Sequence, residues 1–187
     1  KDKKTAERYY LASAKYNKEG YASIGNLYYF RGEKEKGIKK YEEGYAKGDM
    51  KSAYELGSIY EQEGNSEKAM EWYEKGAEGG NVLAQYNLGI VHDNMGNYEE
   101  AEKYYLKAAE QDYLDSQYNL GVLYEGKKEY EKAKKWYLKA AEKGEVRSEN
   151  NLGVVYSKEK NYKEAEKWYL KASKDGNIKA QYNLGNL

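Results

Sequence analysis

The stretch that decides the fold is residues 118–144, which read YNLGVLYEGKKEYEKAKKWYLKAAEKG. Its opening tetrapeptide, YNLG, and its KAA segment both recur in closely similar form at intervals of 32 residues. The repetition is easiest to follow through the glycine that ends the tetrapeptide. This glycine occurs at Gly25, Gly57, Gly89, Gly121, Gly153 and Gly185. Six occurrences at one interval identify a tandem repeat that runs through the chain of 187 residues.

Each repeat contains two segments with the apolar spacing of an α-helix. In one repeat, residues 83–91 form the first segment, and Tyr98, Ala101 and Tyr105 mark the second at intervals of three or four residues. Glycines that commonly end helices follow the first segment at Gly32, Gly64 and Gly96, and the second at Gly48, Gly80, Gly144 and Gly176. Connections this short force neighbouring helices to be antiparallel. The sequence therefore predicts an all-α fold in which helix A, a tight turn, helix B and a second tight turn alternate.

The repeated glycine lies in the middle of helix A, where glycine costs about 1 kcal/mol relative to alanine. A cost repeated in every unit needs a structural reason. We expect the backbone of helix B to approach helix A closely at this position, where a side chain would not fit.

Two motifs resemble known repeat families. The residues LGVLY at 120–124, with the small and aromatic residues of 133–140, are similar to the tetratricopeptide repeat. The residues WYLKAAEKG at 136–144, followed by NLG at 151–153, resemble the Sel1-like repeat. The chain departs from both, because it has no proline and because its A–B turn is as short as that of a tetratricopeptide unit. The resemblance implies a right-handed α/α superhelical solenoid of antiparallel helix pairs, with A helices on the concave side, and a bacterial origin.

The period divides the chain into one tandem array, residues 1–187. Residues 6–15 resemble a helix B and residues 178–187 a helix A, so half a unit is expected at each end. A half unit at each end is expected if the chain is a repeat domain excised from a larger multidomain protein. It is also expected if copies of the array stack head-to-tail through their uncapped ends. The expected units are a partial unit 1–16, full units 17–48, 49–80, 81–112, 113–144 and 145–176, and a partial unit 177–187.

An asparagine recurs two residues before the repeated glycine, and a tyrosine often precedes it. Stacked helices lie about 10 Å apart and an extended peptide advances about 3.3 Å per residue, so successive asparagines can each meet a peptide group. Asparagine both donates and accepts hydrogen bonds, which suits main-chain recognition. The sequence therefore favours a scaffold or adaptor that binds a protein or peptide along the A helices. The alternative, that the amides bond to neighbouring helices, remains open. The candidate binding residues are Asn87, Asn119, Asn151, Asn183, Tyr54, Tyr86, Tyr118 and Tyr182.

Composition argues against several other classes of function. The absence of cysteine excludes disulfides, thiol nucleophiles and cysteine zinc sites. Equal numbers of basic and acidic residues, 32 of each, argue against a nucleic-acid partner, and no apolar stretch is long enough for membrane insertion. The single histidine, His92, takes the place of Tyr60 and Tyr124 in other repeats, which indicates packing. We expect no enzyme, cofactor or metal, and cytoplasmic and secreted locations are equally compatible with the sequence.

Overall fold

The computed structural model describes residues 3–18 and 20–187, and every regular element within these ranges is an α-helix. The predicted all-α fold is therefore confirmed. The chain forms two compact units that divide between Met95 and Gly96. This division falls at the turn between helix A and helix B of the repeat at 81–112.

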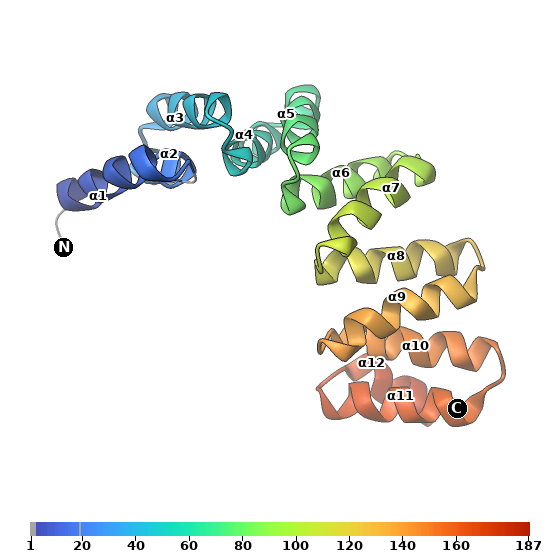
Figure 1. Ribbon diagram of the computed structural model, residues 1–187. Coiled ribbons are helices and arrows are strands. Elements are labelled where there is room, and N and C mark those ends of the chain that lie inside the picture. Colours follow the sequence, from blue (N-terminus) through green and yellow to red (C-terminus); the bar gives the residue numbers. More distant parts are fainter. Residues whose placement is uncertain (1–2, 19) are drawn as a thin grey trace. The chain divides into compact units, whose positions relative to one another are not determined.

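Unit 1 ends at Met95 and contains three B helices alternating with three A helices (Figure 1). Its B helices are α1 (Lys3–Tyr16), α3 (Lys34–Ala46) and α5 (Ser66–Glu78). Its A helices are α2 (Gly20–Phe30), α4 (Met50–Gln62) and α6 (Val82–Asn94).

Unit 2 starts at Gly96 and repeats the alternation. Its B helices are α7 (Tyr98–Glu110), α9 (Tyr130–Glu142) and α11 (Tyr162–Lys174). Its A helices are α8 (Leu114–Gly126), α10 (Val146–Lys158) and α12 (Ile178–Gly185). From α4 onward, helices of the same kind start 32 residues apart, as the sequence predicts.

Within each unit the A helices form a continuous row. In unit 1, α2 contacts α4 and α4 contacts α6, while in unit 2, α8 contacts α10 and α10 contacts α12. Each of α5 and α9 packs between two consecutive A helices. We refer to α2, α4 and α6 as the A row of unit 1, and to α8, α10 and α12 as the A row of unit 2. Each A row presents equivalent positions of successive repeats side by side.

From the turn after α2 onward, each tight turn contains one residue in the left-handed conformation. The seven turn glycines identified in the sequence have φ between 75° and 89°. Where a repeat lacks that glycine, Asp112, Lys128 and Lys160 adopt φ of 65°, 60° and 61°. The backbone geometry is thus kept even where the residue is unfavourable, because the chain must reverse at the same point in every repeat.

The repeated mid-helix glycine lies beneath a tyrosine ring. A Cβ atom placed on Gly121 would lie 2.3 Å from the ring of Tyr137, and one on Gly57 would lie 2.4 Å from the ring of Tyr73. Both rings are fully buried. The expected close approach is present, but its cause differs from the prediction: the ring of the helix B tyrosine, and not the helix B backbone, occupies the space. The same contact joins Gly25 to Tyr41 and Gly153 to Tyr169.

The glycine–tyrosine contact predicts that Gly121→Ala lowers the free energy of unfolding by about 1–2 kcal/mol. Forcing a methyl group against the Tyr137 ring costs about 1–3 kcal/mol, which exceeds the gain of about 1 kcal/mol in helix propensity. Urea unfolding followed by circular dichroism measures the change. Gly126→Ala is the matched control, because a Cβ atom there meets nothing within 4 Å, and it should be neutral or stabilising. Equal stability of the two variants would contradict the prediction.

The turn geometry predicts that Lys128→Gly and Lys160→Gly each raise the free energy of unfolding by about 0.5–1 kcal/mol. Glycine adopts positive φ without the steric cost that a lysine side chain brings. The control is Lys47→Gly, because Lys47 lies at a helix end with φ of −94°, where glycine gains nothing and should destabilise. The same urea series tests all three variants, and a loss of stability at both positions 128 and 160 would refute the account of the turns.

Candidate protein-binding surface

The eight candidate binding residues all lie on A helices, but they are divided between the two units. Tyr182 is 73% exposed, and the other seven side chains are half-buried. Each unit therefore brings its own subset together. Tyr54, Tyr86 and Asn87 lie on α4 and α6, and Tyr118, Asn119, Asn151, Tyr182 and Asn183 lie on α8, α10 and α12.

In unit 2 a buried tyrosine joins two A helices through hydrogen bonds. The hydroxyl of Tyr137 donates to Oε2 of Glu125 on α8 at 2.9 Å and accepts from Nδ2 of Asn151 on α10 at 3.0 Å. Lys158 Nζ donates to the other oxygen of Glu125 at 2.6 Å. Burial is the main cause that raises the pKa of Tyr137, so its hydroxyl stays protonated and can donate. Asn151 therefore has a structural contact in addition to any role in binding.

The hydrogen bonds continue along the A row through Asn150. Its Nδ2 donates to Oδ1 of Asn151 at 3.1 Å, and its Oδ1 accepts from Nδ2 of Asn183 on α12 at 3.1 Å. Asn150 is not among the candidate residues predicted from the sequence. The signal was present, since Asn150 stands where Tyr54, Tyr118 and other repeats have a tyrosine.

Unit 1 contains the same kind of contact. The hydroxyl of Tyr73 donates to Oε2 of Glu61 on α4 at 2.7 Å, and the nearby amide of Asn87 on α6 acts to lower the pKa of that hydroxyl. Burial again raises the pKa of this tyrosine. In the preceding repeat Glu55 holds the asparagine position and hydrogen-bonds with Asn26, while burial raises the pKa of its carboxyl group.

Asn119 differs from the other two candidate asparagines of unit 2. Within the part of the chain that the structure describes, its amide makes no hydrogen bond, whereas those of Asn151 and Asn183 each donate one. On α8, Asn119 follows the half-buried Tyr118 and lies one turn before Val122, whose side chain is 42% exposed. An open amide on the same helix as these aromatic and aliphatic side chains can pair with a peptide group.

Several charged side chains around this surface are paired with one another. Arg147 Nη2 lies 2.5 Å from Oδ1 of Asp115, its Nε lies 2.6 Å from Oε1 of Glu145, and its guanidinium carbon lies 4.3 Å from the ring centre of Tyr118. Farther along the same two helices, Lys158 is paired with Glu125. The A row of unit 2 thus offers a surface without a dominant sign of charge.

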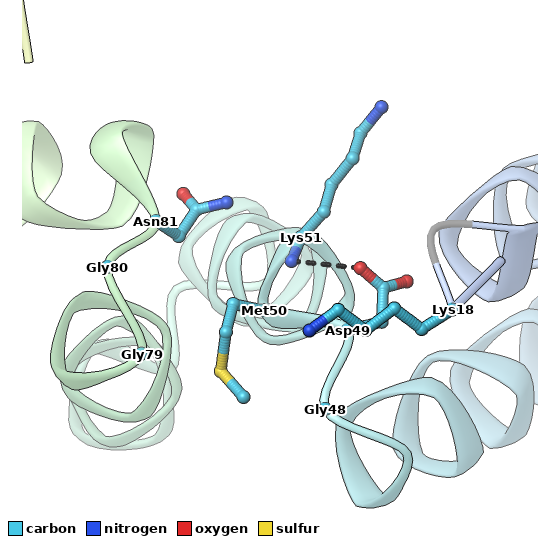
Figure 2. Close-up of a pocket in the computed structure, with 8 residues that line it drawn as sticks. All are labelled: Lys18, Gly48, Asp49, Met50, Lys51, Gly79, Gly80 and Asn81. Carbon is cyan, nitrogen blue, oxygen red and sulfur yellow. Dashed lines mark hydrogen bonds between the residues drawn. The ribbon is translucent and has the colours of Figure 1, made fainter.

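A hollow of about 400 Å³ lies in unit 1 where the B–A turns precede α4 and α6 (Figure 2). Asp49 faces it, but both of its carboxylate oxygens have partners. Oδ1 accepts from the backbone N–H of Lys51 at 3.2 Å, and Oδ2 accepts from the N–H of Ala22 and from Ser52 Oγ. Asp49 therefore caps α4 and ties it to α2. The hollow is lined by Lys18, Gly48, Asp49, Met50, Lys51, Gly79, Gly80 and Asn81.

The described residues contain neither a metal-binding cluster nor a membrane-spanning helix. No group of three or more histidine, aspartate or glutamate side chains there is placed to hold a metal ion. No helix in the same ranges is both long and apolar enough to span a bilayer. His92 is a half-buried residue of α6.

A glutamine on α8 and a glutamate on α10 occupy equivalent buried positions. Gln117 Nε2 donates to the carbonyl oxygen of Ala109 at 3.2 Å. One repeat later Glu149, which is fully buried, has no N–H to offer. Lys171 takes over this role: its Nζ lies 2.9 Å from Glu149 Oε1 and 3.5 Å from the carbonyl oxygen of Ala141.

Comparison with known repeats agrees with this architecture. Tetratricopeptide repeat profiles match residues 51–78, 82–112 and 147–174, and the Sel1 repeat profile matches residues 114–145. The chain belongs to the Sel1- and tetratricopeptide-like repeat proteins. Repeats of this family are typically non-enzymatic scaffolds for protein interaction.

Solved structures of other repeat proteins share the fold. The chain is 32% identical to c5321, described as a protective antigen of uropathogenic Escherichia coli with an SLR fold, with a TM-score of 0.78 over 96% of this chain. It spans 43% of the c5321 chain. A Sel1 repeat protein from Oxalobacter formigenes is 26% identical, with a TM-score of 0.69 over 93% of this chain and 80% of the other.

YrrB, described as a tetratricopeptide repeat protein with an unusual peptide-binding site, is 20% identical, with a TM-score of 0.65 over 95% of this chain and 98% of its own. At this identity the likeness concerns the fold alone. Together with the other two structures it identifies this repeat protein as an all-α helical solenoid. No curated protein sequence matches the chain.

The buried glutamate predicts that Glu149→Gln raises the free energy of unfolding by about 1 kcal/mol. The new amide can donate to the carbonyl oxygen of Ala141, as Gln117 does to Ala109, and the buried charge is removed. Lys171 does not become a buried unpaired charge, because its side chain is 48% exposed. Urea unfolding measures the change, with Glu142→Gln on the exposed side of α9 as a neutral control. A less stable Glu149→Gln variant would show instead that the ion pair is net stabilising.

Proposed function

We propose that the repeat protein acts as a non-enzymatic adaptor, without cofactor, metal or nucleic-acid partner, and that the A row of unit 2 binds an extended segment of a partner protein. The observation that carries the proposal is the open amide of Asn119, near Tyr118 and Val122 on α8. This amide has no hydrogen bond within the described chain, so a ligand can pair with it without breaking an existing bond. Because the side chain is half-buried, the amide has already lost part of its hydration before the ligand binds.

The surface around Asn119 suits a main chain better than a charged side chain. The amide offers both a donor and an acceptor, so it can pair with the N–H and C=O of one residue in an extended segment, which point to the same side. Val122 provides apolar area for a small side chain. The nearby Arg147 is held by Asp115, so it is not available as a free cation. A neutral extended segment is therefore the favoured ligand.

The remaining candidate residues take secondary roles in this proposal. Asn151 and Asn183 keep their contacts within the A row and add only their unused hydrogen-bonding capacity, while Tyr182 supplies an exposed aromatic surface. Tyr54, Tyr86 and Asn87 form an equivalent but separate surface in unit 1. The peptide-binding site named for YrrB supports the proposal only by showing that the fold can serve this purpose. Head-to-tail stacking of copies stays a prediction of the repeat pattern.

A displayed library of random twelve-residue peptides, selected on the purified chain, supplies the probe for this proposal. We expect Asn119→Ala to weaken the best selected peptide about tenfold, which corresponds to about 1.4 kcal/mol, and Asn151→Ala to lower stability more than affinity. Isothermal titration calorimetry measures the affinities. Asn94→Ala, an exposed asparagine on α6, is the control. Unchanged affinity in a folded Asn119→Ala variant would refute the proposed surface.

A further inference from the structure

The exposed face of α11 is strongly basic. Six residues line a shallow hollow of about 450 Å³ on this helix. They recur at intervals of three and four residues and so form one stripe along the helix. Four of them are lysines, against one glutamate, and Leu170 lies between them with 40% of its side chain exposed. The residues of this α11 face are Lys163, Glu166, Lys167, Leu170, Lys171 and Lys174.

The same six positions of α5 carry the opposite charge. This α5 face has four glutamates against one lysine. Its glutamates are all exposed. The residues of the α5 face, in chain order, are Glu67, Met70, Glu71, Glu74, Lys75 and Glu78. The repeats therefore share their packing residues but present opposite charges to solvent at equivalent positions.

Most of these charges have no partner within the described part of the chain. Two internal pairs involve the α11 face, Lys167 with Glu164 at 3.2 Å and Lys171 with Glu149 at 2.9 Å. The α5 face has one, Lys75 with Glu71 at 2.6 Å. The described residues include no ion pair for the lysines and glutamates that remain. These are Lys163, Glu166, Lys174, Glu67, Glu74 and Glu78.

The order of the charges fits an antiparallel pairing of the two faces. When α5 runs opposite to α11, Lys163 meets Glu78, and Lys174 meets Glu67. The single glutamate of the α11 face is matched as well, because Glu166 meets Lys75, the one lysine of the α5 face. In a parallel pairing Lys171 would meet Lys75, and like charges directly opposed are unfavourable. The antiparallel register thus places opposite charges together at both ends and in the middle.

We propose that the α11 face of one copy docks antiparallel on the α5 face of a second copy of this chain. The occupant is assigned by charge complementarity, since the chain itself supplies an acidic helix face with the matching order of charges. The contact joins two different surfaces, so it can either close in a pair or propagate along a chain of copies. Because its charges are exposed, the association is weak and strongly dependent on salt.

Two charge-reversed variants test the contact. The first carries Lys163→Glu, Lys167→Glu and Lys174→Glu, and the second carries Glu67→Lys, Glu74→Lys and Glu78→Lys. Each variant alone has two faces of like charge, so we expect its self-association to weaken at least about tenfold relative to the unaltered chain. Mixed together, the two variants again present opposite charges and should associate within about threefold of the unaltered chain.

Sedimentation equilibrium at 50 mM and 500 mM NaCl measures these affinities, and circular dichroism checks that each variant is folded. Lys47→Glu, Lys128→Glu and Lys160→Glu together form the control, because they change the net charge by the same amount as the first variant, at exposed positions outside both faces. This control should associate as the unaltered chain does. The proposal is overturned if the unaltered chain stays monomeric at low salt, if either reversed variant still associates normally, or if the folded mixture fails to associate.

Discussion

Within each of the two units, helix pairs are stabilised by a tyrosine ring of helix B that packs on a glycine of the preceding helix A. The missing Cβ atom of Gly121 makes room for the ring of Tyr137, and the buried ring fixes the distance between helix A and helix B. The tyrosine hydroxyl is carried toward the A row, where a buried donor needs a partner. Glu125 and Asn151 satisfy it from two different A helices. The packing contact thus also determines the polar chemistry of the surface where a ligand is proposed to bind.

The fold could be predicted because the repetition makes each local signal appear several times. A single glycine before a turn is weak evidence, but turn glycines that recur 32 residues apart locate the ends of most helices. The individual departures could not be predicted in this way. Lys128 and Lys160 adopt positive φ only because the neighbouring repeats impose the turn, and the sequence around them contains no signal of its own for that conformation.

The binding surface was only partly predictable, for a related reason. The sequence places Asn119, Asn151 and Asn183 at equivalent positions, and repetition suggests that they behave alike. Their hydrogen bonds instead depend on side chains outside that column. Asn150 stands where other repeats have tyrosine, and it joins Asn151 to Asn183. Asn119 lacks such a neighbour and keeps its amide open. A hydrogen-bond partner that lies on another helix cannot be predicted from the residue type at a single position of the repeat.

The repeat also separates stability from recognition. From α3 onward, every B helix carries a buried tyrosine at this position, because any change there disturbs two helices at once. These residues are Tyr41, Tyr73, Tyr105, Tyr137 and Tyr169. The exposed positions of the B helices are free of this constraint, and there α5 is acidic while α11 is basic. A surface charge can be reversed at a cost usually below 0.5 kcal/mol in stability. Different repeats can therefore acquire different partners while all of them keep the same fold.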